Sequence, residues 1–322
     1  MRAILNWRSA CGALALLAWA GLLAGAGQQT LFPTPDDGVK ALVSAAEAKD
    51  QAAMTAVLGP EREKLLSGDP VEDAAALNRF AANLRKSVKL ERVDDSKFTL
   101  VVGEDQFPFP IPLVKDGNQW RFDTAAGLEE ILSRRIGQNE LSAIMTCRAY
   151  VVAQWEYYTK ALDTSEDGLA VYAQKFISTP GQRDGLYWDV PEGDKPSPMG
   201  TLITEARAEG YPAGRPQTAA GTDPGASPRP RTPFHGYFFR ILKAQGEHAP
   251  GGKFSYVING HMIAGYGLVA FPAKWGSGGV MTFLVNNQGR VYQKNLGAES
   301  AEIAGALTEY DPDPSWTLVK EP

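Results

Sequence analysis

The stretch NELSAIMTCRAYVVAQWEYYTK, residues 139–160, sets the layout of the chain. Apolar side chains recur in it at every third or fourth position, which is the spacing of one helix face. A long core helix is therefore predicted to end near Lys160, with an apolar face made of Leu141, Ile144, Met145, Val151, Val152, Trp155 and Tyr158. A separate helix is predicted before it, because Gly137 is expected to interrupt the pattern and Asn139 to restart it.

The residues before this helix predict an α+β unit. The segments TPDD (34–37) and DPVE (69–72) each place a capping side chain, a proline and an acid in the order that begins a helix. A short helix is expected between them, after Asp50. Four strands of a curled antiparallel sheet should follow at 88–93, 98–102, 107–114 and 119–122, the proline-rich third one as an edge strand or flap. Helices followed by such a sheet resemble the small folds of the nuclear-transport-factor and cystatin-like type.

The residues after the helix predict a second α+β unit. Short helices are expected at 169–177 and 202–209, in a region whose part from 190 to 233 is a proline- and glycine-rich loop holding nine of the 22 prolines. Strands predicted at 237–243, 254–258, 261–271, 280–285 and 290–294 form an antiparallel meander, with Asn259-Gly260 as a hairpin turn and a last helix at 300–308. The predicted division is a segment 1–26, a domain 27–123 and a domain 124–322.

The first 26 residues have the composition of a secretory signal peptide. Arg2 and Arg8 precede an apolar run that ends in Ala24-Gly-Ala26, a small-residue cleavage pattern. The run is shorter than the roughly 20 residues that span a bilayer, so cleavage after Ala26 is favoured over a retained anchor. A periplasmic or secreted protein is therefore predicted, with no transmembrane segment after cleavage.

Charge and cysteine content narrow the function classes. Loss of Arg2 and Arg8 would change the net charge from −5 to −7, and an acidic chain without a dense basic stripe makes nucleic acid an unlikely partner. Cleavage would also remove Cys11 and leave Cys147 without a cysteine to pair with. A buried thiol is the favoured interpretation of Cys147 over a nucleophile, because no base is placed near it by sequence.

No familiar catalytic or metal-binding pattern occurs in the sequence. The three histidines, His235, His248 and His261, lack the spacing of metal ligands, and neither Gly-x-Ser-x-Gly nor Ser-x-x-Lys is present. The glycine-rich residues 275–279 lie between two predicted strands and indicate a turn. The sequence thus predicts no catalytic residue, no metal site and no cofactor.

Aromatic residues in loops are the best candidates for a binding site. In Arg183-Asp-Gly-Leu-Tyr-Trp188 a charge pair adjoins two large rings, and exposed Tyr and Trp provide contact area at low entropic cost. The alternative, that Tyr187 and Trp188 cover a sheet edge, has equal weight. His235 is assigned a structural or recognition role, because spacing specifies no orienting carboxylate for it. The predicted lining of a groove is Asp184, Tyr187, Trp188, His235 and Tyr237.

Several segments together resemble a bacterial exported family catalogued as domain of unknown function 2950. They are FPFPIP (107–112), WRFDTAAG (120–127), RRIGQNEL (134–141), DGLYW (184–188), HGYFFR (235–240) and VMTF (280–283), and the resemblance covers nearly the whole mature chain. It implies export and supplies no activity. The second half also resembles, more faintly, the globular heads of type IV pilins and pseudopilins, without the greasy half-helix that packs their filaments.

These observations predict a non-enzymatic periplasmic module that binds a protein or an envelope component through aromatic-rich loops. The first alternative is an envelope hydrolase with an unfamiliar site at His235 and Asp184, and the second is a structural pseudopilin-like subunit.

Overall fold

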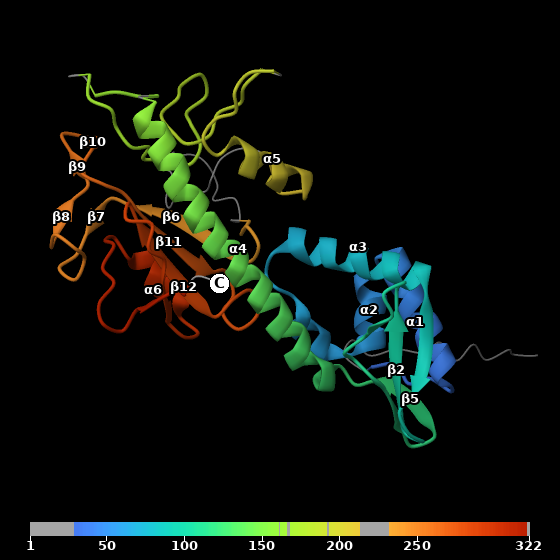
Figure 1. Ribbon diagram of the computed structural model, residues 1–322. Helices are drawn as coiled ribbons and strands as arrows, with labels where there is room; N and C mark the ends of the chain where they lie inside the picture. The colour runs from blue at the N-terminus through green and yellow to red at the C-terminus, as the bar shows by residue number, and fades with distance from the viewer. Residues whose placement is uncertain (1–28, 161, 166–167, 192, 213–231, 321–322) are drawn as a thin grey trace, which may run out of the picture.

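The computed structural model describes residues 29–160, 162–165, 168–191, 193–212 and 232–320. The predicted signal peptide at 1–26 lies outside the described residues, as do residues 213–231 of the predicted loop. The described part is an α+β structure with antiparallel sheets (Figure 1). In that part, no helix combines the length and the apolar character needed to cross a membrane.

The N-terminal helices begin where the capping patterns predict. The Thr34 hydroxyl and the Asp50 and Asp69 carboxylates each accept hydrogen bonds from the first-turn backbone N–H groups of a helix. Proline occupies the first turn after Thr34 and after Asp69, where its missing N–H costs nothing. The helices are α1 (Pro35–Ala48), α2 (Gln51–Leu58) and α3 (Pro70–Lys86), with the 3-10 helix η1 (Pro60–Leu65) between the last two.

The first sheet follows these helices. Its strands are β1 (Val88–Arg92), β2 (Lys97–Val102), β3 (Phe107–Pro108), β4 (Leu113–Asp116) and β5 (Gln119–Phe122), in the order β1-β2-β4-β5 with β3 also paired to β2. The predicted strand 107–114 is therefore two short strands along one edge of β2, because three alternate prolines remove the N–H donors that a continuous ladder needs. The helices and this sheet enclose one hydrophobic cluster, in which Leu42, Leu100, Leu113 and Phe122 are fully buried.

Helix α4 (Thr124–Thr159) is continuous over 36 residues, which corrects the predicted break at Gly137. Gly137 has ordinary helical backbone, and a Cβ at this position would meet nothing within 4 Å. Gly127 differs, because a Cβ there would lie 2.7 Å from the carbonyl oxygen of Pro110, so glycine lets α4 begin against the segment between β3 and β4. At 1.5 Å per residue α4 is about 54 Å long, and it runs from the first sheet past the second (Figure 1).

The face by which α4 enters the core is not the predicted one. Four members of the predicted apolar face are exposed: Leu141, Met145, Val152 and Trp155 have exposed fractions of 63%, 68%, 65% and 60%. The buried face consists of small and polar residues and tyrosines: Ala143, Thr146, Cys147, Tyr150, Ala153, Gln154 and Tyr157. Small residues let α4 approach the sheet closely, and buried polar groups find partners there, such as the Tyr150 hydroxyl that donates to Gly267 O at 3.2 Å.

Gln154 also explains why residues 169–177 are extended and not helical as predicted. Its side-chain amide donates to Ala173 O (2.7 Å) and accepts from Ala173 N (2.8 Å), so it pairs with this backbone as a strand would. Val171 and Ala173 are buried as alternate residues of the extended segment. The other predicted short helix is present as α5 (Gly200–Ala208).

The second sheet has the order β14-β13-β12-β11-β6 and is antiparallel. Alternate residues of β11 contact different layers. Leu268 and Ala270 join the cluster on the α4 side, whereas Val269 and Phe271 join the cluster with Ala304. The strands are β6 (Tyr237–Leu242), β11 (Gly267–Pro272), β12 (Met281–Asn286), β13 (Tyr292–Asn295) and β14 (Thr317–Leu318), and Ala304 belongs to α6 (Ser300–Ala306).

Two small strand pairs connect β6 to β11. They are β7 (Ala244–Gln245) with β8 (Phe254–Ser255), and β9 (Val257–Ile258) with β10 (His261–Met262). Asn259 and Gly260 have φ values of +50° and +84°, so the predicted hairpin turn between β9 and β10 is confirmed. The predicted strand 261–271 is divided at Gly265, whose φ is +146° and where a Cβ would lie 2.9 Å from the Tyr256 ring.

Buried polar side chains join the N-terminal helices to the second sheet. Asp69, fully buried, caps α3 with Oδ1, and its Oδ2 accepts from the Tyr211 hydroxyl (2.8 Å) and from Gly236 N (3.2 Å). Asn139 of α4 donates to Glu72 Oε2 (3.1 Å) and to Gly278 O (3.0 Å). Burial raises the pKa of Glu72, although the hydrogen bond from Asn139 opposes this effect.

Candidate functional site

Strand β6 lies at the end of the second sheet. Among the strands that the structure describes it pairs with β11 alone, and Gly236 O, just before it, accepts from Ala273 N at 2.9 Å. Because hydrogen-bonded and non-hydrogen-bonded pairs alternate in an antiparallel ladder, the even-numbered residues of β6 bond to β11. The backbone N–H and C=O groups of its odd-numbered residues therefore point to the outer edge.

This outer edge is filled at both ends and open in the middle. Tyr237 exchanges two backbone hydrogen bonds with Phe234, at 3.0 and 2.9 Å, and Lys243 O accepts from Tyr256 N at 2.8 Å. Between these positions the N–H and C=O groups of Phe239 and Ile241 have no hydrogen-bond partner among the described residues. The gap amounts to two donors and two acceptors in extended geometry.

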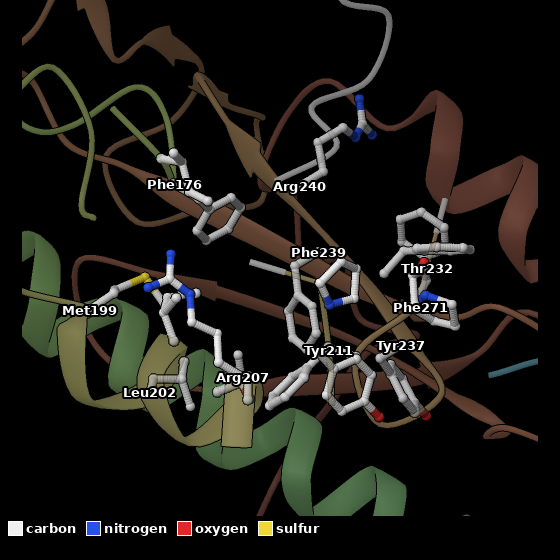
Figure 2. A pocket seen from close by; sticks show the side chains of 18 of the residues that line it. Phe176, Met199, Leu202, Arg207, Tyr211, Thr232, Tyr237, Phe239, Arg240 and Phe271 are labelled. Carbon is white, nitrogen blue, oxygen red and sulfur yellow. The ribbon is translucent and has the colours of Figure 1, made fainter. Parts of the chain in front are cut away.

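A cavity of about 270 Å³ lies along this strand, between β6 and α5, and extends around the edge to Phe271 and Gly305 on the other face. A liquid water occupies about 30 Å³, so the space suits roughly nine methylene-sized groups, enough for one large aromatic side chain. Most of the lining is aromatic or aliphatic, including Phe176, Met199, Leu202, Tyr211, Tyr237 and Phe239. Figure 2 shows Phe239 in the middle of this group, with Tyr211 and Tyr237 beside it.

Two arginines border the cavity and differ in their surroundings. Arg240 turns away from the middle of the cavity (Figure 2), and its guanidinium donates to the carbonyl oxygens of Ala304 and Leu307 at the end of α6. Arg207 of α5 extends toward Met199 and Phe176. Its Nη1 donates to Asp189 Oδ1 at 3.1 Å, and its Nε is buried without a partner among the described residues.

Tyr187 and Trp188 line a second cavity, of about 490 Å³, which Arg207 also lines. The Arg207 guanidinium lies 5.0 Å from the Tyr187 ring, and the Tyr187 hydroxyl donates to Asp189 at 2.6 Å. Trp188 stacks under the Arg183 guanidinium at 5.4 Å. Of the predicted groove residues, Tyr237 lines the first cavity and Tyr187 and Trp188 line the second, so Arg207, which borders both, is their common neighbour.

Asp184 and His235 have different partners from each other. Asp184 accepts from Thr179 N at 2.7 Å and pairs with Lys175. Burial alone would raise the pKa of Asp184, but the hydrogen bonds from Lys175 and Thr179 outweigh it, and the pKa lies below its usual value. The loop 179–184 is thereby closed on itself.

His235 belongs to the turn that precedes β6. Its φ is +47°, its Nε2 lies 3.1 Å from Glu209 Oε2, and its backbone N–H donates to the Tyr211 hydroxyl at 3.0 Å. Its ring also packs against the rings of Tyr211 and Phe234, both of which line the first cavity. These contacts fix the turn at the entrance of β6, and the hydrolase hypothesis for His235 and Asp184 stays a prediction. No three His, Cys, Asp or Glu side chains of the described chain come together in a way that could hold a metal ion.

Sequence patterns do not identify the residues that make β6 an open edge or those that line the cavity beside it. Phe239 was one apolar residue in a predicted strand, and no pattern indicates which strand of a meander lies at the end of the sheet. Arg207 and Tyr211 lie in and after a predicted short helix, far in sequence from β6. The run Tyr237-Phe-Phe-Arg-Ile241 was the one available signal, because a strand with large apolar residues on both faces must be covered on both.

Comparisons with known proteins add one finding. A family model described as protein of unknown function (DUF2950) matches residues 29–319. No curated protein matches the chain, and no solved structure does.

Proposed function

The chain belongs to the DUF2950 family, described as proteins of unknown function, and we propose that it is an exported, non-enzymatic binding protein. The proposed ligand is an extended, apolar peptide segment of a partner protein, which adds as a strand to the outer edge of β6. One of its side chains enters the cavity between β6 and α5.

The observation that carries this proposal is the gap in the ladder at Phe239 and Ile241. Backbone donors and acceptors in a folded protein are paired almost without exception, and an unpaired strand edge is a template for another chain. Here the gap is bounded at Tyr237 and Lys243, whose outward groups are already bonded. A guest strand would thus make four main-chain hydrogen bonds in a fixed position, which is the mode of recognition by strand addition.

The cavity adds selectivity for side chains. Its aromatic lining and its volume of about 270 Å³ suit a phenylalanine-sized group and leave little room for more. Four hydrogen bonds at about 1 kcal/mol each and burial of one aromatic side chain at about 3 kcal/mol give roughly 7 kcal/mol before the cost of ordering the guest. We therefore expect dissociation constants no tighter than about 10 µM for short peptides.

The predicted signal peptide supports an exported location, so the partner is an exported or envelope protein. The acidic net charge, −5 for the whole chain and −7 after loss of Arg2 and Arg8, disfavours nucleic acid as a partner. Strand addition requires no titrating group, which fits a site whose nearest ionisable side chains are engaged with one another, as Arg207 is with Asp189.

The test uses an acetylated heptapeptide of alternating threonine and phenylalanine and two N-methylated versions of it. One version carries methyl groups on two threonine amides, the other on two phenylalanine amides. Only one set of amides can face β6, so we expect one version to lose two hydrogen bonds, about 2 kcal/mol or roughly 30-fold in affinity, and the other to bind like the parent peptide.

Amide hydrogen exchange locates the contact. The N–H groups of Phe239 and Ile241 should exchange fast in the free protein and slowly in the complex, while those of Phe238 and Arg240 are protected in both. Ile241→Pro should abolish peptide binding, because proline removes the backbone N–H that points to the outer edge and that β11 does not use. Ile241→Val is the matched control, because it keeps this N–H. Equal binding of both methylated peptides, or binding without protection at Phe239, would rule out strand addition.

A further inference from the structure

The exposed side of α4 carries an apolar stripe, defined here as Leu141, Met145, Val152 and Trp155. Each of these side chains is 60–68% exposed. Scattered apolar residues are normal on a protein surface, but four large ones in line on one helix, two on each side of Arg148, form a patch of the kind that marks interaction sites. Arg148 lies in the same line, between Met145 and Val152.

The spacing of the stripe is that of a helix pair. From Leu141 the steps are four, three, four and three residues, through Arg148 to Trp155. This alternation keeps a seam facing a second helix, whereas the opposite side of α4 is buried against its own sheet. Ser142 and Ala149, which flank the seam, are small and let a second backbone approach closely.

We infer that two copies of this chain pair through α4, antiparallel and related by a two-fold axis. In an antiparallel pair, first and fourth heptad positions face each other, and of the registers that this allows we choose the one centred on residue 150, which places Met145 against Trp155 of the second copy. The same register places Arg148 against Val152 of the second copy and Leu141 against Thr159 of the second copy. Methionine sulfur against an aromatic ring is a favourable contact, and a two-fold axis makes it twice.

Charge favours a second helix over a lipid surface. Arg148 lies in the middle of the stripe, where acyl chains would have to accept a cation. Side chains lean toward the N-terminus of their own helix, so Arg148 lies near Glu156 of the second copy, which keeps its own ion pair with Lys160. The two-fold axis repeats this approach of opposite charges.

The exposed area is enough for a weak dimer. Four large side chains that are each about two-thirds exposed offer roughly 500 Å² per copy, or about 1,000 Å² in total, the lower limit for a specific interface. Ile144 and Val151, half-buried beside the stripe, add to it. We expect a dimer with a dissociation constant of roughly 10–100 µM. An interface near this lower limit of area contributes only a little more free energy than association costs in lost freedom.

Sedimentation of the full chain with Cys11→Ser, from about 1 to 300 µM, tests the pairing. We expect a monomer at the low end and a dimer at the high end. Val152→Glu should abolish the dimer at all concentrations, while Val93→Glu, at another exposed valine outside α4, should leave it unchanged. A monomer throughout, or a dimer that survives Val152→Glu, would overturn the inference.

Cysteine cross-linking tests the register. Met145→Cys with Trp155→Cys in one chain should give a covalent dimer on mild oxidation, because the two positions meet across the axis and lie about 15 Å apart within one helix. Leu141→Cys with Met145→Cys should give little, since these positions do not face each other. Cys147 is fully buried and does not compete.

Flotation with phosphatidylglycerol vesicles covers the lipid alternative. If the protein stays monomeric but binds the vesicles, and Val152→Glu abolishes this binding, the stripe contacts a membrane surface and not a second copy. That result would overturn the inference. Equal cross-linking of both cysteine pairs would also overturn it, because it would show contact without register. Peptide binding at β6 is measured separately and does not depend on either result.

Discussion

Replacement of Asp69 is the sharpest test of how the cavity is held in place. The carboxylate is fully buried and accepts four hydrogen bonds: Oδ1 from Val71 N and Glu72 N, and Oδ2 from the Tyr211 hydroxyl and Gly236 N. Asp69→Ala removes a helix cap, worth about 1 kcal/mol, and leaves two buried donors without acceptors at about 1–3 kcal/mol each. We expect a loss of about 4 kcal/mol in the free energy of unfolding.

Asp50→Ala is the matched control for this change. Asp50 caps α2 with the same two bonds, to Ala52 N (2.9 Å) and Ala53 N (3.0 Å), but it lies at the surface. Its replacement should cost about 1 kcal/mol, so the difference between the two variants, about 3 kcal/mol, measures the bonds to Tyr211 and Gly236. Urea denaturation followed by circular dichroism gives both values.

The same replacement should also weaken peptide binding, because Tyr211 lines the cavity and Gly236 begins the approach to β6. Tyr211→Phe, which removes the donor to Asp69 and the acceptor of His235 N–H but keeps the ring, should cost about 2 kcal/mol in stability and little in binding. If Asp69→Ala and Asp50→Ala were equally destabilising, the hydrogen bonds of Asp69 Oδ2 to Tyr211 and Gly236 would contribute nothing to the free energy of unfolding, which contradicts the prediction.

Three further predictions follow from burial. Burial raises the pKa of Tyr256 to about 12 and raises those of Tyr237 and Tyr310 as well, while an unfolded tyrosine ionises near 10. Their contribution to stability is therefore fully present below pH 10 and is lost as pH rises above it. Absorbance at 295 nm should show these tyrosines ionising together with unfolding, and ionisation of all eleven tyrosines near pH 10 without unfolding would contradict this. Burial also raises the pKa of Cys147 to about 12, so Ellman's reagent should leave it unmodified in the native protein and react fully in urea, whereas fast native reaction would show that the thiol is accessible. Gly279→Ala would place a Cβ 2.2 Å from the Tyr237 hydroxyl, and should cost at least about 2 kcal/mol in urea denaturation where Gly305→Ala, with nothing within 4 Å, should not; equal stability of the two variants would show that Tyr237 moves aside freely.

Local features of the fold could be predicted where the chemistry of a single residue is enough to form them. Thr34, Asp50 and Asp69 cap helices as expected, because a side-chain acceptor next to free N–H groups needs no distant partner. The Asn259-Gly260 turn is confirmed for the same reason, since both residues tolerate positive φ.

Predictions failed where the burial or the conformation of a segment depends on a contact that is distant in sequence. Periodicity identified α4 but chose the wrong face, because the sheet selected small residues and hydrogen-bonding groups such as Tyr150 and Gln154, and the larger apolar residues point outward. Residues 169–177 are extended because of that same glutamine, 19 positions away from Ala173. Within the candidate site, Tyr237 could be named from sequence, whereas the open edge at Phe239 follows from strand order, which no local pattern contains.

The uninterrupted helix α4 has a mechanical consequence. Its first turns are anchored by the N-terminal cluster, through Ile131, and its last four turns by the cluster beneath the second sheet, from Ala143 to Tyr157. Between these anchorages Gly137 and Gln138 face solvent, and a glycine inside a helix forfeits about 1 kcal/mol relative to alanine, but Asn139 and Glu140 next to them are bonded to other parts of the chain. The bonds of Asn139 and Glu140 brace this span, so bending, and with it proteolytic nicking, should start around Gly137 only after these bonds have broken.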